Sequence, residues 1–160
     1  MAKIGQIIPL PFEQRVAGFT HILRLGAADL AALTSGTAQA VIPNNDAAVF
    51  NTFVAGLHVS KVVPRVVTAF TSSGGAITTL TLSLGDGGSG IRFVNAQDGK
   101  TIAWGVSYTS KYVYTVADTI DFTATIVGQT MASINAGQVD FYLQLEDASP
   151  LVNVVEPSAT

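Results

Sequence analysis

The amino-acid sequence predicts an all-β protein, an antiparallel β-sandwich of the jelly-roll type preceded by an extended N-terminal arm. Apolar and polar residues alternate with a period of two in several segments, which is the pattern of strands that bury one face. Clusters of Gly, Asn and Ser separate these segments and mark turns. Only residues 26–36 and 44–56 have helix-like sequences, and the second segment could equally be an irregular loop. We expect one sandwich domain over residues 17–148.

Residues 1–16 are expected to form the arm. They lack the period of two, and Pro9 and Pro11 remove amide donors and hold the chain open. Their apolar side chains cannot all join the sandwich core, because the prolines break any strand register there. We therefore predict that the arm attaches to a partner through five apolar side chains, Ile4, Ile7, Ile8, Leu10 and Phe12.

The strands of the sandwich follow in chain order. The segment 57–70 is apolar on both faces, as in a long central strand, and Pro64 within it requires an edge position or a bulge. Residues 149–160 are expected to form a C-terminal tail. The other predicted strands are 19–25, 37–43, 79–84, 91–96, 101–104, 111–116, 119–126 and 139–147.

Gly85, Gly87 and Gly90 have the G-x-G-x-x-G spacing of a dinucleotide-binding loop. That loop needs a helix after its glycines, whereas strand-like residues and another turn follow Gly90. We interpret the glycines as a turn between two strands and expect no cofactor. Asp86 lacks the converging carboxylates of a calcium site, so we expect no metal there and place this residue at a mobile loop tip.

No catalytic residue is assigned, and we expect that the protein is not an enzyme. His21 and His58 have apolar neighbours and no carboxylate at helical or strand spacing, so they are interpreted as satisfied or interface histidines. Asp118 and Asp121 are three residues apart on a predicted strand, where they face opposite sides. Asp118 is expected to open the strand, and Asp121 to face solvent.

The composition favours protein association. Hydrophobic residues make up 48% of the chain and charged residues only 12%, so few charges oppose self-association. The net charge of −3 argues against nucleic acid as a partner. The sequence contains neither a signal peptide pattern nor an apolar run long enough for a membrane span, so we expect synthesis in a cytoplasm and no membrane partner.

Four aromatic residues lie close together in the sequence: Trp104, Tyr108, Tyr112 and Tyr114. They could stack against a sugar, because flat apolar faces with polar rims suit pyranose rings. They could equally form a sheet face or a subunit contact, where Tyr and Trp are enriched for the same amphipathic reason. Both interpretations stay open at this point, with the contact favoured.

The order of several segments resembles the auxiliary proteins of tailed-bacteriophage capsids, called decoration or cement proteins. The matching segments lie between residues 20 and 147 and read "HILRLGAADLAAL", "VVPRVVTAF", "LTLSLGDG", "YVYTVADTIDFTATI" and "AGQVDFYLQLED". The resemblance implies a β-sandwich that assembles as a homotrimer on the outer capsid surface, in contact with the major capsid protein, and stabilises the head. Synthesis would then take place in the bacterial host cytoplasm. The alternative is a carbohydrate-binding or receptor-binding head of a phage fibre or tail.

Overall fold

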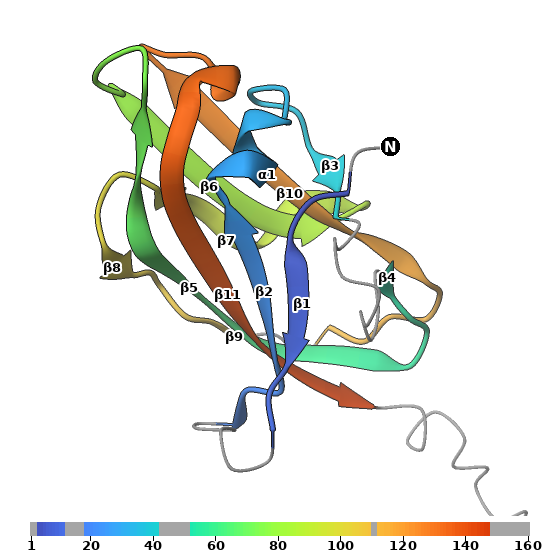
Figure 1. The fold of residues 1–160 in the computed structure, drawn as a ribbon. Coiled ribbons are helices and arrows are strands. Elements are labelled where there is room, and N and C mark those ends of the chain that lie inside the picture. Colours follow the sequence, from blue (N-terminus) through green and yellow to red (C-terminus); the bar gives the residue numbers. More distant parts are fainter. Residues whose placement is uncertain (1–2, 12–17, 42–51, 110–111, 148–160) are drawn as a thin grey trace, which may run out of the picture.

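Two antiparallel sheets pack face to face in the computed structural model, which describes residues 3–11, 18–41, 52–109 and 112–147 (Figure 1). The first sheet has the order β1 (Gln6–Pro9), β2 (His21–Gly26), β11 (Ile134–Asp147) and β5 (Leu57–Ser72), and both β8 (Ala103–Trp104) and β9 (Tyr108–Thr109) pair with β5. In the second sheet, β3 (Gln39–Ala40) and β4 (Thr52–Phe53) both pair with β10 (Asp118–Val127), followed by β6 (Thr79–Asp86) and β7 (Ser89–Asp98). The short helix α1 (Ala27–Ala31) and the 3₁₀ turn η3 (Met131–Ser133) complete the described elements.

The strand order confirms the predicted jelly roll. β3 and β4 occupy one position beside β10, and β8 and β9 occupy one position beside β5, so each pair acts as one interrupted strand. When β2 is counted as the first strand and each of these pairs as one strand, eight strands result. Their order is 1-8-3-6 in the first sheet and 2-7-4-5 in the second. Chain neighbours therefore lie in opposite sheets except at the β6–β7 hairpin, which is how two Greek keys close a jelly roll.

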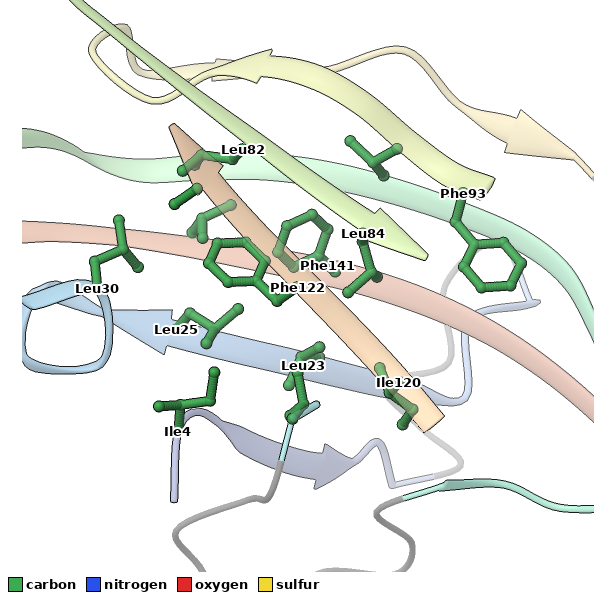
Figure 2. Packing of buried hydrophobic residues seen from close by; sticks show 14 of the residues in the cluster. Ile4, Leu23, Leu25, Leu30, Leu82, Leu84, Phe93, Ile120, Phe122 and Phe141 are labelled. Carbon is green, nitrogen blue, oxygen red and sulfur yellow. The ribbon is translucent and has the colours of Figure 1, made fainter. Parts of the chain in front are cut away.

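The core lies between the two sheets and is filled by alternate residues of the strands (Figure 2). Phe122 of β10 and Phe141 of β11 meet across the core, with ring centroids 5.9 Å apart. Leu23 and Leu25 of β2 are also fully buried. Burial of each such side chain stabilises the fold by about 1.5–3 kcal/mol before the cost of ordering it.

The long strand β5 is central, as predicted, although Pro64 lies within it. The Pro64 carbonyl accepts a hydrogen bond from the Gly105 amide at 2.8 Å, so this residue directs its backbone polar groups toward the β8–β9 side. Pairing on that side is interrupted between β8 and β9. The missing amide hydrogen of Pro64 therefore removes no ladder bond. Trp104 and Tyr108 are four positions apart, whereas their partners Arg65 and Val62 are three apart, so the register is irregular opposite Pro64, as the sequence led us to expect.

The predicted arm is a strand, and this corrects the sequence-based interpretation for residues 3–11. β1 pairs with β2 at the edge of the first sheet, with Ile7 opposite Leu23. The side chains of Ile4 and Ile7 are 1% and 0% exposed and belong to the core, and Leu10 is also buried. Ile8, on the other face, is half-buried. The remaining arm residue, Phe12, lies outside the described residues.

Pro9 did not prevent pairing because it is the last residue of an edge strand, a position that tolerates a missing amide hydrogen. The carboxylate of Asp29 in α1 fixes the start of the same segment. It accepts hydrogen bonds from the amides of Gly5, at 2.8 Å, and Gly26, at 2.7 Å. These contacts tie the N-terminal segment to β2 and α1.

Two further predictions turned out differently. The helix-like segment 44–56 contains the short strand β4 at Thr52–Phe53, and residues 44–51 lie outside the described part of the chain. In the predicted strand 111–116, the described residues pair only through an isolated bridge between Val113 and His58. The predicted tail, residues 149–160, lies outside the described residues. The helix predicted in residues 26–36 is confirmed as α1.

Candidate functional site

The glycine motif forms a tight hairpin between β6 and β7, as the sequence predicted. Gly87 and Gly88 alone connect the two strands. Gly85 and Gly90 lie on facing strands so close together that a Cβ atom on Gly85 would stand 1.9 Å from the Ser89 carbonyl oxygen. The motif therefore allows close backbone approach between two strands, and no helix follows it as in a dinucleotide-binding fold.

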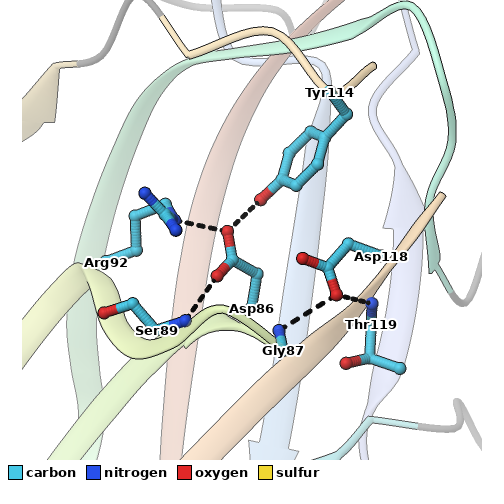
Figure 3. A network of polar contacts seen from close by, with 7 residues as sticks. All are labelled: Asp86, Gly87, Ser89, Arg92, Tyr114, Asp118 and Thr119. Atoms are coloured by element: carbon cyan, nitrogen blue, oxygen red, sulfur yellow. Dashed lines mark hydrogen bonds and ion pairs between the residues drawn. The ribbon is translucent and has the colours of Figure 1, made fainter. Parts of the chain in front are cut away.

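Asp86, the last residue of β6, is the centre of a buried polar network (Figure 3). Its carboxylate is 0% exposed and forms an ion pair with the Arg92 guanidinium. It also accepts hydrogen bonds from the Tyr114 hydroxyl at 2.6 Å and from the Ser89 amide at 2.8 Å. The expectation that Asp86 lies at a mobile loop tip was wrong, because one ion pair and two further hydrogen bonds hold its carboxylate inside the fold.

The partners of Asp86 are held in their protonated, donating forms. Burial, followed by the hydrogen bond to Asp86, raises the pKa of Tyr114 far above that of a free phenol. The hydrogen bond to Asp86 likewise raises the pKa of Arg92. The Tyr114 ring also stacks on Phe53, with centroids 4.9 Å apart. This network joins the hairpin to the strand β4 and to the segment before β10, and its chemistry is that of a structural brace.

Asp118 supports the same hairpin from the neighbouring strand. Its carboxylate accepts hydrogen bonds from the Gly87 amide at 3.2 Å and the Thr119 amide at 2.8 Å (Figure 3). Asp118 is the first residue of β10, as predicted. Its carboxylate therefore holds the turn against the start of the next strand.

The four aromatic residues that are close in sequence do not form one surface. Tyr114 is 2% exposed, and Tyr108 points inward and packs against Phe93. Tyr112 contacts the Tyr114 ring edge-on. The Arg92 guanidinium lies over the Tyr112 ring, 4.4 Å from its centroid. Trp104 lies apart from these three tyrosines and contacts Tyr142. A sugar platform made of all four rings is therefore excluded.

Trp104 lies instead on the outer face of the first sheet. In the strand register, Trp104 lies opposite Arg65 of β5, and Arg65 lies opposite Asp140 of β11. The alternate positions, Val66 and Val139, are in the core, so Trp104 and Arg65 point away from it. Trp104 is 57% exposed, and the centroid of its ring lies 5.2 Å from that of Tyr142.

An open groove lies between β7 and the β8–β9 segment. It has a volume of about 520 Å³, and its lining includes Pro64, Ile91, Phe93, Val106 and Tyr108. Two of the residues that line the groove are strongly exposed apolar side chains, Val106 at 87% and Ile91 at 53%.

The histidines are engaged within the fold. His21 Nδ1 lies 2.9 Å from the Thr20 hydroxyl, and His58 Nδ1 lies 3.2 Å from a Glu146 carboxylate oxygen. The second contact joins β5 to β11, which sequence spacing could not reveal. In the part of the chain that the structure describes, no three His, Asp or Glu side chains converge as metal ligands. None of the described helices has the length and apolar character to span a membrane.

Comparison with known proteins gives little beyond this geometry. No protein-family model matches the chain, and no curated protein sequence matches it. A solved structure described as "Cyanophage Pam1 capsid asymmetric unit" is 15% identical, with a TM-score of 0.49. The similarity covers 89% of this chain and 86% of that chain. A similarity of this size establishes neither a shared family nor a shared function.

Proposed function

We propose that the chain is a structural virion protein, a decoration or cement protein that assembles as a homotrimer on the outer surface of a phage capsid and stabilises the head. The sequence resemblance over residues 20–147 supports this role. The jelly-roll sandwich agrees with it, because a rigid double sheet presents broad faces and edges to neighbouring proteins.

The observation that carries the proposal is the apolar side of the sandwich at the groove between β7 and the β8–β9 segment. Val106 and Ile91, which line this groove, are 87% and 53% exposed. A monomer gains nothing from leaving such side chains in water, and grouped exposed apolar residues mark surfaces that bind other proteins. We assign this side to contacts between subunits of the homotrimer, where a closed ring would cover it.

The buried carboxylates support a structural role. Asp86 is enclosed by Arg92, Tyr114 and the Ser89 amide. Asp140, which is 1% exposed, accepts hydrogen bonds from Arg24 Nε at 2.8 Å and Arg24 Nη2 at 2.7 Å. Both carboxylates thus accept hydrogen bonds from groups of the same chain, and these bonds order the fold.

Light scattering tests the subunit contact. The purified protein should have about three times the monomer mass of 16.6 kDa at micromolar concentration. Ile91→Asp and Val106→Asp should shift the mass toward the monomer, because each places a charge in an apolar contact. Thr125→Asp is the matched control, since Thr125 is exposed on β10 and does not line the groove. A monomeric wild-type protein would contradict the homotrimer.

Cryo-electron microscopy tests the placement on the virion. Protein added to undecorated capsids of the source phage should appear as ordered density on the outer surface, in contact with the major capsid protein. Absence of such density, together with saccharide binding that is lost in Trp104→Ala, would favour the alternative of a carbohydrate-binding or receptor-binding head.

A further inference from the structure

The outer face of the first sheet carries a row of aromatic rings. Tyr142 of β11 is in the middle, between Trp104 of β8 at 5.2 Å and Phe19 at 5.7 Å. The neighbours of Tyr142 along β11, Phe141 and Leu143, are fully buried, so Tyr142 faces away from the core. The row crosses the sheet from the segment before β2 to the edge strand β8.

Two cations lie on this row. The Arg65 guanidinium stands 4.8 Å from the Trp104 ring centroid, and the Lys61 ammonium 5.1 Å from the Phe19 centroid. Among the described residues, neither cation has a carboxylate within 4.0 Å, whereas Arg24 and Arg92 are each paired with a buried aspartate. The rings hold these two cations in place without neutralising them.

We propose that this aromatic–cationic face, made of Phe19, Lys61, Arg65, Trp104 and Tyr142, binds an acidic surface of a protein partner. The inference rests on the proposed function, in which that partner is the capsid shell. Arg, Trp and Tyr are the side chains that most often dominate binding energy at protein interfaces. The two cations call for Asp and Glu side chains opposite them, because complementary charge sets the orientation and the rate of association.

The charge of this face is a local property, since the chain as a whole has a net charge of −3. The acidic residue beside it, Asp140, is 1% exposed and already paired with Arg24. Glu146 lies further along β11 and contacts His58. An acidic partner surface therefore meets Lys61 and Arg65 without competition from a neighbouring carboxylate of the same sheet.

The ring geometry favours a protein over a nucleic acid or a sugar. Stacking of bases or pyranose rings needs open aromatic faces. Here the Tyr142 ring is tilted by 42° from Trp104 and by 60° from Phe19, so the three rings form no common plane. Arg65 and Lys61 also occupy ring faces of Trp104 and Phe19.

Trp104 is the only tryptophan of the chain, so its fluorescence reports directly on this face. We would titrate the full-length protein with a short poly-glutamate peptide at low salt, and with poly-lysine as the control peptide. Poly-glutamate should change the emission in a saturable way, and added NaCl should weaken the response, because exposed charge pairs are screened. Poly-lysine should give no saturable change.

The decisive comparison uses two variants with the same change of charge. Lys61→Glu should weaken poly-glutamate binding about tenfold, because it replaces an attractive contact by a repulsive one. Lys100→Glu should leave it nearly unchanged, since Lys100 contacts the Thr78 carbonyl elsewhere on the surface. Equal effects of the two variants, or no saturable response of the wild type, would overturn the proposal. A stronger response to a single-stranded oligonucleotide or a neutral oligosaccharide would also overturn it.

The same variants separate this inference from the proposed function. If wild-type protein decorates capsids, Lys61→Glu should reduce decoration while the trimer mass stays unchanged. Decoration that is insensitive to Lys61→Glu would contradict the inference and would still support the proposed function. Poly-glutamate binding that Lys61→Glu weakens, without decoration by the wild type, would uphold the acidic-partner surface and reject the capsid role.

Discussion

Among single residues, Asp86 has the most extensive polar contacts of the β6–β7 hairpin. Replacing it with Ala would leave the Arg92 guanidinium and the Tyr114 hydroxyl partly buried without their acceptor. We expect Asp86→Ala to lower the free energy of unfolding by about 3–5 kcal/mol, as for other ion pairs broken from one side. Tyr114→Phe removes one hydrogen bond to a charged group and should cost about 1.5–3 kcal/mol.

Urea unfolding at one fixed protein concentration measures both effects. Asp121→Asn is the control, because Asp121 lies on the outer side of β10 and should change stability by no more than about 0.5 kcal/mol. If Asp86→Ala behaved like Asp121→Asn, the network would be unimportant for the fold.

The glycine at position 85 is required by close packing of two backbones. A Cβ atom there would lie 1.9 Å from the Ser89 carbonyl oxygen and 2.4 Å from the Gly90 carbonyl carbon, and backbone atoms cannot move aside cheaply. Gly85→Ala should therefore destabilise the protein by about 1–3 kcal/mol or more. At Gly88 the nearest atom would be an Arg92 guanidinium nitrogen at 3.2 Å, the end of a flexible side chain. Thermal unfolding should show a clearly larger loss for Gly85→Ala than for Gly88→Ala, and equal losses would contradict the steric explanation.

At the scale of elements, β1 shows how a segment without a strand pattern can still join a sheet. Ile7 is 0% exposed, whereas its neighbour Gln6 is exposed. Ile7→Ala should lower the free energy of unfolding by about 2–5 kcal/mol, because it leaves a cavity in the core. Gln6→Ala should change it by no more than about 0.5 kcal/mol.

Chemical denaturation of the two variants distinguishes a strand from an attachment arm. An arm that binds only a partner would make Ile7→Ala silent in unfolding of the isolated protein and harmful only to attachment. That result would restore the role first expected for this segment.

At the scale of the whole molecule, a closed homotrimer links stability to concentration. Subunit association stabilises the folded state by mass action, so the melting temperature should rise with protein concentration. Calorimetry over an about hundredfold concentration range should show this rise for the wild type and for Thr125→Asp. Val106→Asp should abolish it by placing a charge at the apolar side. A wild-type melting temperature that does not depend on concentration would argue against a reversible trimer.

The sequence by itself determined the fold class and the inward faces of the main strands. Alternation of apolar and polar residues is a local property, so the inward positions Phe122 and Phe141 could be assigned without knowing what they pack against. The turn at Gly85–Gly90 was likewise predicted from neighbouring residues alone. Even Asp86 had a usable signal, because it continues the inward series of Leu80, Leu82 and Leu84 by one more step.

Only the tertiary structure decided which distant segments meet. Arg24 and Asp140 are 116 positions apart, yet they form one ion pair because β2 and β11 are neighbours. The row of Phe19, Tyr142 and Trp104 arises in the same way, whereas the aromatic residues close in sequence separate onto different faces. Pro9 is compatible with a strand because β1 is at a sheet edge. Strand order fixes all of these contacts, and strand order depends on long-range pairing that no local pattern contains.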